Sequence, residues 1–199
     1  ARAPIVLPEL QATFAVSRND DSAWHVGRAG MRYRDLIPGR QNGRFIASHI
    51  AIPEAGPVPD YVHYHRIRFQ MIYCHKGWVR VAYEDQGEPL VLHPGDCFLQ
   101  PPLIRHQVLE ASPGLQVVEI ASPAWHQTLA DHDLPLPNRL GDPDRDFGGQ
   151  RFVHHVSADS PWDPWTTPGF ERQDIGIERA TDGLARVAMI RAAGGTATD

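Results

Sequence analysis

The chain has 199 residues, 42% of them hydrophobic, and a formal net charge of −5, a composition typical of a globular domain with a substantial buried core. The acidic balance and the presence of a single lysine, Lys76, argue against nucleic acid as a partner. No apolar run approaches the length that spans a membrane, and the opening letters ARAPIVLPEL lack the charged-then-apolar order of a secretory signal. We therefore expect a cytoplasmic protein with no membrane partner.

Prolines and glycines are frequent, 18 and 17 in number, and they interrupt the chain too often for long helices. This composition favours many short strands joined by turns. The two cysteines, Cys74 and Cys97, form neither a CxxC pair nor a disulfide-dense scaffold, so we expect both thiols to be reduced.

In chain order, residues 1–41 show little sign of regular structure and are expected to form an irregular lead-in. Apolar runs bounded by turns then predict strands at 43–52, 61–67, 69–75, 78–84, 90–93, 97–100 and 115–122. Gly77 and the letters PGD at 94–96 mark turns between them. Many short strands in so short a stretch predict an all-β protein built on a small barrel or jelly roll.

Three histidines in this region suggest a metal site. His63 and His65 lie two residues apart on a predicted strand, so their side chains share one face. Their backbones are about two strand rises, or roughly 6.5 Å, apart, which lets the two imidazoles converge on one ion. His106, from a later part of the chain, would complete three sides of a coordination sphere. The alternative is that all three are structural histidines that pair within the fold.

Two motifs surround these histidines, and together they resemble the motifs of the cupin family. The first reads Gly56, HYH at 63–65, Gln70 and Gly77, and the second reads Gly95, Pro101 and His106. The resemblance covers roughly residues 42–120 and implies a barrel over 42–122, the RmlC-like jelly roll also called a double-stranded β-helix, with one bound divalent metal ion. The ligands that it implies in this chain are His63, His65, Gln70 and His106.

Gln70 departs from the family pattern, which usually has Glu at this place. It lies five positions after His65, so it faces the same interior only if a turn separates two strands. A neutral amide leaves the ion's full +2 charge in the site, which strengthens the Lewis acid and favours an anionic ligand. The alternative is that Gln70 lies outside the coordination sphere and three histidines alone hold the ion.

The sequence leaves several metals and several substrate-binding residues possible. Imidazole ligands suit Fe, Mn, Ni, Co, Cu and Zn, so the ligand set does not select one metal. Arg68 and Arg105 lie near the ligands in sequence and are candidate anchors for a substrate carboxylate. Solvent exposure or packing explains the remaining candidates at least as well as ligand binding: His75, His93, Trp125, Asp131, His132, Asp133, His154, His155, Trp162 and Trp165.

The C-terminal part contains a possible internal repeat. Residues 30–56 can be aligned with 169–195, which matches Gly30 with Gly169, Asp35 with Asp174, Arg40 with Arg179 and Gly43 with Gly183. Residues 169–199 would then be the start of a truncated second cupin, as in the N-terminal part of a bicupin. Residues 123–168, rich in Pro, Asp and Trp, would be a linker. The alternative is a chance similarity between two strand-and-turn segments.

Two functional hypotheses follow from the resemblance. The first is a metal-dependent dioxygenase acting on a small aromatic, enolic or diketone-like substrate, with a Lewis-acid isomerase or lyase as a variant. The second is a non-catalytic domain that binds or senses a small anionic molecule. Fold analogy alone does not choose between them, and no GxSxG, HExxH or phosphate-binding glycine motif points to another class. Because small barrels expose sheet edges that pair, we also expect a homodimer.

Overall fold

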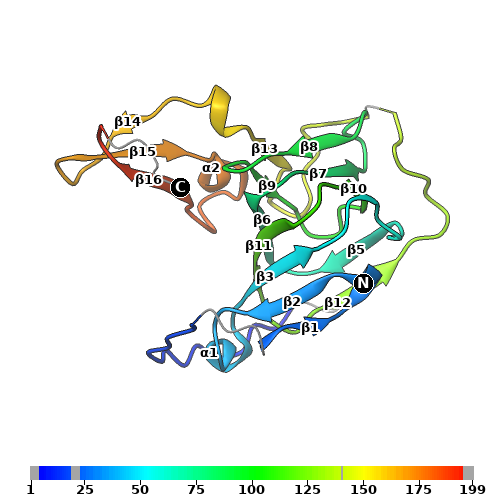
Figure 1. Cartoon of the computed structure of the whole chain (residues 1–199), viewed down its shortest axis with the longest axis horizontal. Helices are drawn as coiled ribbons and strands as arrows, with labels where there is room; N and C mark the ends of the chain where they lie inside the picture. The colour runs from blue at the N-terminus through cyan, green and yellow to red at the C-terminus, as the bar shows by residue number, and fades with distance from the viewer. Residues whose placement is uncertain (1–4, 19–22, 140, 195–199) are drawn as a thin grey trace.

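The structure is a computed structural model that describes residues 5–18, 23–139 and 141–194. Two antiparallel sheets form its body (Figure 1). The seven-stranded sheet has the spatial order β1 (His25–Val26), β2 (Arg32–Asp35), β3 (Ile46–Ile52), β11 (Leu115–Ser122), β6 (Phe69–Lys76), β9 (Cys97–Leu99) and β13 (Val153–His155). The six-stranded sheet has the order β12 (Gln127–Ala130), β5 (His63–Arg66), β10 (His106–Ala111), β7 (Val79–Tyr83) and β8 (Leu90–Leu92), with β4 (Gly56–Pro57) paired to β10.

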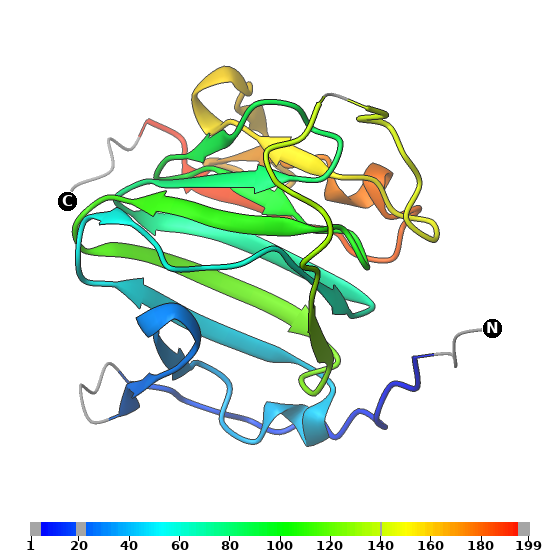
Figure 2. The same cartoon turned by 90° about the vertical axis from the view of Figure 1, so that its right-hand side faces the viewer.

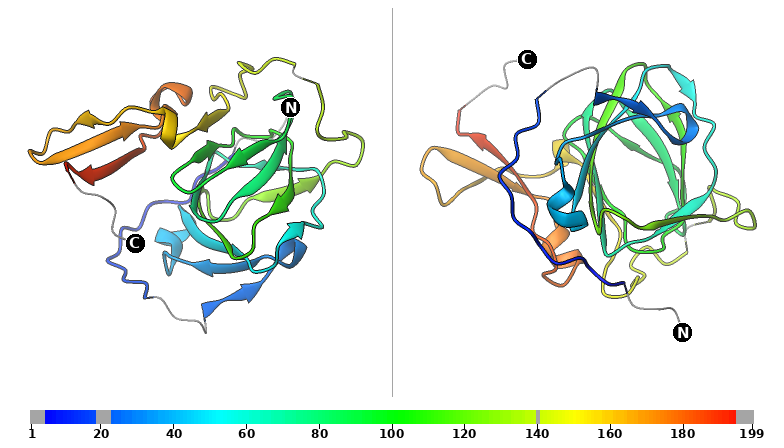
Figure 3. Two further views of the ribbon diagram at one scale, coloured as in Figure 1. Left: turned by 45° about the horizontal axis from the view of Figure 1, so that its top comes forward. Right: turned by 90° about the horizontal axis from the view of Figure 1, so that it is seen from below.

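The strands of both sheets wrap around a common interior, and residues 5–18 run along the outside (Figure 2 and Figure 3). Four short helical elements lie wholly within the described residues, each a single turn: η2 (Arg28–Gly30), α1 (Arg40–Gly43), η3 (Ser157–Asp159) and α2 (Ile177–Ala180). Among the described residues, no helix is long and apolar enough to span a membrane. The arrangement confirms the predicted all-β jelly-roll barrel.

All the strands predicted between residues 43 and 122 are present, because their side chains alternate between interior and exterior. In β11, Leu115, Val117 and Ala121 are buried, and the residues between them are more exposed. β11 lies in the middle of the seven-stranded sheet, between β3 and β6. The strand predicted at 115–122 is therefore a central strand of this sheet.

Strand β10 was not predicted, although it carries His106. Its pairing with β7 shifts register between Val108 and Glu110, which marks a β-bulge. An extra residue in a strand breaks the two-residue alternation on which the prediction depends. Strands β1 and β2 also lie within the lead-in of residues 1–41, where β2 pairs with β3 and extends the sheet.

Large side chains from both sheets fill part of the interior. Tyr83, Leu92 and Phe98 are almost fully buried, and the rings of Tyr83 and Phe98 meet edge to face with their centroids 5.0 Å apart. The two cysteines are free and buried. Burial raises the pKa of Cys74 to about 11 and the pKa of Cys97 to about 12, so both remain protonated thiols at neutral pH.

The C-terminal segment forms a third sheet of β14 (Asp163–Pro164), β15 (Phe170–Asp174) and β16 (Ala188–Ala192), which lies to one side of the barrel (Figure 1). It packs through Ile175 and Ile177 against Met71 and Leu99. Met71 and Leu99 belong to the seven-stranded sheet and face away from the barrel interior. The tail therefore covers the outer face of that sheet.

The two segments that align in sequence share local features. Asp35 Oδ1 accepts a hydrogen bond from the backbone N–H two residues later at 3.0 Å, and Asp174 Oδ1 does the same at 2.9 Å. Each aspartate is followed by a short helical turn and then a strand that pairs back antiparallel, β3 and β16 respectively. These features agree with the alignment, and a common origin as a repeat stays a prediction.

Candidate metal centre

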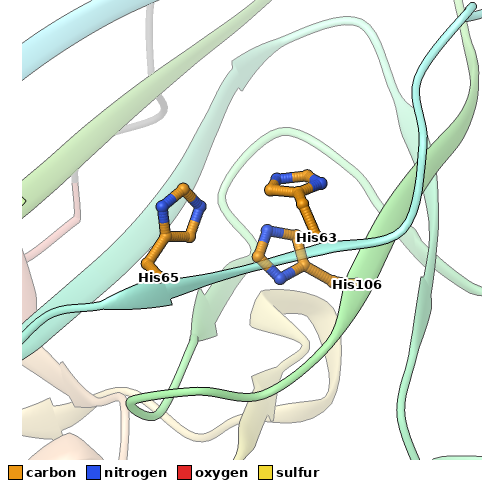
Figure 4. A group of neighbouring side chains, drawn as sticks. All are labelled: His63, His65 and His106. Atoms are coloured by element: carbon orange, nitrogen blue, oxygen red, sulfur yellow. The ribbon is translucent and has the colours of Figure 1, made fainter. Parts of the chain in front are cut away.

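Strands β5 and β10 bring the three predicted histidines together. On β5, His63 and His65 are more buried than Tyr64 and Arg66, so their rings lie on the inner face. His106 begins β10 and is the direct cross-strand neighbour of His63. The three rings lie close together, as Figure 4 shows. Strand alternation and one cross-strand pair are enough to create this cluster.

The side chains are close enough to share one ion. One ring nitrogen of each histidine lies within 4.8 Å of the corresponding nitrogens of the other two. The ring centroid of His106 is 4.2 Å from that of His63 and 5.2 Å from that of His65. Within the described ranges, no other group of three or more His, Cys, Asp or Glu side chains is this compact.

Hydrogen bonds hold the Nδ1 atoms and leave the Nε2 atoms for other partners. His63 Nδ1 lies 2.8 Å from the Tyr61 carbonyl oxygen, and His106 Nδ1 lies 3.1 Å from that of Ile104. A carbonyl oxygen only accepts, so these Nδ1 atoms carry the proton and Nε2 keeps the lone pair that binds a metal. The Nε2 atom of His63 is buried and has no hydrogen-bond partner in the described structure, which fits the role of a metal ligand.

His65 is held in a similar way by a different strand. Its Nδ1 lies 2.9 Å from the Thr128 hydroxyl, and Thr128 on β12 is its cross-strand partner. Each of the three imidazoles thus has a fixed ring orientation before any ligand arrives. Such fixed imidazoles are typical of metal sites.

The environment keeps all three histidines neutral. Burial is the main cause, and it lowers the pKa of His65 to about 2 and that of His106 well below its ordinary value. The pKa of His63 is also lowered by burial and by Arg28, while Asp60 opposes the shift. Neutral imidazole is the form that binds metals, so no proton has to leave before a metal ion binds at neutral pH.

The same shifts predict how the stability of the metal-free protein depends on pH. A histidine in the unfolded chain titrates near 6.5, whereas folded His65 titrates near 2, so below pH 6.5 the unfolded state binds more protons. Stability is therefore complete above pH 6.5 and decreases as the pH falls, by up to about 1.4 kcal/mol per pH unit for each such histidine. Urea unfolding at pH 7.5 and pH 5.0 should show a smaller loss in His65→Gln than in the wild type. An equal loss in both proteins would contradict this assignment.

Two histidines of the triad, His65 and His106, line a cavity of about 490 Å³ inside the barrel, which we call the triad cavity. Its lining is mostly apolar and comes from both sheets, for example Ile50, Ile72, Val81, Phe98, Leu115 and Val117. Gln70 lines the same cavity as His65 and His106, because residues 67–68 separate β5 from β6 and reset the strand parity. The predicted ligand residues are thus assembled at one cavity, and the role of Gln70 as a ligand stays a prediction.

Two charged residues near the triad were not predicted from the sequence. Glu119 on β11 lines the cavity and accepts a 2.6 Å hydrogen bond from Nε2 of Gln70. Arg28, which belongs to the N-terminal lead-in, also lines the cavity. Its guanidinium forms an ion pair with the buried carboxylate of Asp60. Asp60 also accepts a hydrogen bond from the backbone N–H of Val108 at 3.0 Å. Neither Glu119 nor Arg28 belongs to a sequence motif.

The arginines predicted as substrate anchors lie elsewhere. Arg68 and Arg105 line a second cavity of about 920 Å³ and do not line the cavity of the triad. Arg105 donates to Asp131 at 3.0 Å and stacks over the Tyr64 ring, 4.4 Å from its centroid. Their role as substrate anchors stays a prediction, and the structure offers Arg28 as the arginine at the triad cavity.

No protein-family model matches the sequence, and no curated protein matches it either. Solved structures do. A deletion mutant of Bacillus subtilis oxalate decarboxylase OxdC superposes with a TM-score of 0.53 at 14% identity, over 88% of this chain and 57% of that one. An RmlC-like cupin from Shewanella frigidimarina gives 0.47 at 25% identity, over 58% of this chain and 96% of that one. The polyketide cyclase RemF from Streptomyces resistomycificus gives 0.48 at 18% identity, over 61% and 89%.

Proposed function

We propose that this chain, which shares the fold of a cupin oxalate decarboxylase, is a member of the cupin superfamily and a metal-dependent enzyme, of dioxygenase type, acting on a small aromatic, enolic or diketone-like substrate. The observation that carries the proposal is the convergence of three neutral imidazoles, one with an unpartnered buried Nε2, two of which line a mostly apolar cavity. His63, His65 and His106 would hold one divalent transition metal ion, with Gln70 as a fourth ligand. When bound, such an ion supplies Lewis acidity and, for redox-active metals, electron transfer to O₂.

The chain's own residues provide the substrate site. The apolar walls suit a flat or branched carbon skeleton. Arg28 keeps N–H donors beyond the one that it gives to Asp60, so it can hold an anionic oxygen of the substrate. A mostly apolar cavity with a cationic side chain in its lining therefore favours a small substrate with an enolate or carboxylate group.

One observation favours a second candidate function. The carboxylate of Glu119 lies in the cavity, where it could accept a proton from a substrate carbon without any need for O₂. A Lewis-acid isomerase or lyase would use the site in this way. The third possibility, a non-catalytic binding or sensor domain, needs the same cavity but no turnover.

Oxygen consumption separates these functions. The protein should be loaded in turn with Fe, Mn, Ni, Co, Cu and Zn, and each form assayed with a panel of diketones and phenols in an oxygen electrode. We expect O₂ uptake with at least one substrate, lost in His106→Ala and kept in His93→Ala, which changes an exposed histidine outside the site. Turnover without O₂ would favour the isomerase or lyase, and saturable binding without turnover would favour the sensor.

The N-terminal segment supports a homodimer as the assembly state. Val6 is 81% exposed and Phe14 is 95% exposed, although both are large apolar residues. Backbone groups near them are tied to the barrel by Gln41 and Arg44, so the segment has a defined course. An ordered apolar strip of this kind suits contact with a second copy.

Light scattering tests this assembly directly. We expect the mass of two chains instead of the 22.2 kDa of one, and we expect Phe14→Asp to shift the protein towards the monomer. Ile190→Asp, which changes an exposed residue of the tail, serves as the control and should leave the mass unchanged. A monomer mass for the wild type would contradict the proposal.

A further inference from the structure

Gln70 and Glu119 form a hydrogen-bonded pair on the inner face of the barrel. Strands β6 and β11 are neighbours, with Gln70 opposite Ala121 and Glu119 opposite Ile72, so the two side chains are diagonal neighbours. Gln70 is only 3% exposed, and its Nε2 lies 2.6 Å from Glu119 Oε1. Both side chains line the cavity of the triad.

This contact fixes which end of the Gln70 amide is available. A carboxylate only accepts hydrogen bonds, so the NH₂ group of Gln70 has to face Glu119. The amide oxygen, the end with a lone pair for a metal ion, is then directed away from Glu119. Within the described part of the chain, Gln70 Oε1 accepts no hydrogen bond, so it remains available in the cavity that His65 and His106 share.

We propose that Glu119 is a positioning residue that presents the amide oxygen of Gln70 to the metal ion, an inference that rests on the proposed metal site. Glu119 acts through Gln70, because its own oxygens do not belong to the compact cluster of metal-binding atoms found among the described residues. It also places one negative charge behind a neutral ligand. The negative charge that a Glu ligand would bring to the metal site is thus supplied by Glu119, which is hydrogen-bonded to the ligand Gln70.

The hydrogen bond between Gln70 and Glu119 predicts what happens when the amide and the carboxylate exchange positions. Gln70→Glu alone would set two carboxylates at hydrogen-bond distance with no donor between them, and they would repel. Glu119→Gln alone would remove the charge and leave two amides that can pair in either orientation. In the double variant Gln70→Glu with Glu119→Gln, the new carboxylate accepts from the new amide, and the charge of the pair is unchanged.

Cobalt affinity and cobalt absorption spectra test the proposal. Each protein should be titrated with Co²⁺ against a competing chelator while the visible spectrum, which reports coordination, is recorded. We expect Glu119→Gln, which loses the group that orients the ligand, to bind Co²⁺ about 10- to 100-fold more weakly than the wild type. The double variant should recover most of that loss and a spectrum close to that of the wild type. Gln116→Glu, which adds a carboxylate on β11 outside the cavity, should leave affinity unchanged.

Several outcomes would overturn the proposal. Singles with wild-type affinity and spectrum would show that Glu119 does not position Gln70, and losses that multiply in the double variant would show that the two residues act independently. Should Gln70→Glu not fold, Gln70→Ala and Glu119→Ala replace it, and their double variant should be no weaker than Gln70→Ala. His63→Ala in the same titration separates the two ideas. If it binds Co²⁺ like the wild type, the metal site itself is wrong, whereas its loss beside unaffected Glu119 variants contradicts only the positioning role.

Discussion

Replacing His63 or His106 with alanine should reduce bound metal from close to one ion per chain to a trace. One ring nitrogen of each lies within 4.8 Å of the other and of His65, and the Nε2 of His63 has no partner among the described residues. Two remaining imidazoles lack the third side of the coordination sphere, so a dialysed protein cannot retain the ion. Elemental analysis of dialysed protein, scaled to protein concentration, gives the result directly.

The controls for this experiment come from the same chain. His93→Ala removes an exposed histidine and should leave the metal content unchanged. His106→Gln, which keeps a polar side chain beside the Ile104 carbonyl, should lose the metal while unfolding at a urea concentration close to that of the wild type. Unchanged metal content in both His63→Ala and His106→Ala would end the metal-site assignment.

Truncating Ile177 to alanine should lower the free energy of unfolding by about 2–5 kcal/mol, the range for large-to-small changes in a packed core. Ile177 is fully buried and packs with Met71 and Leu99 on the outer face of the seven-stranded sheet. Gln70, the neighbour of Met71 on β6, faces the opposite side, towards the cavity. The variant should therefore lose stability and keep its metal. Urea unfolding and elemental analysis measure the two effects.

A matched change in the same segment gives the baseline. Leu184 is 39% exposed, so Leu184→Ala should change the stability by no more than about 0.5 kcal/mol. If Ile177→Ala behaves like Leu184→Ala, the tail does not stabilise the barrel, and the packing of the third sheet against β6 and β9 is wrong. Loss of metal from Ile177→Ala would show instead that the tail supports the metal centre.

Periodicity explains which strands the sequence could predict. β3 and β11 carry apolar runs with one face against the core, and both were predicted close to their observed bounds. β10 was missed because its bulge interrupts the alternation. β12 is short and largely exposed, so it carries no apolar pattern at all. Local pattern therefore identified the strands with a recognisable apolar run and missed β10 and β12.

Some residues of the site could be predicted from the sequence, and others could not. His63, His65 and His106 were predictable because their spacing follows strand geometry and a family motif. Glu119 reaches Gln70 only through the pairing of β11 with β6, and Thr128 reaches His65 only through the pairing of β12 with β5. These contacts join residues far apart in the chain, so no local signal in the sequence marks them.

Locating the metal in the protein tests the central claim most directly. Crystals of cobalt-loaded wild-type protein, measured at the cobalt absorption edge, should show one anomalous peak per chain at bonding distance from Nε2 of His63, His65 and His106. The amide oxygen of Gln70 should face the same peak. A peak at another position, or no peak in protein that contains cobalt by elemental analysis, would contradict the account.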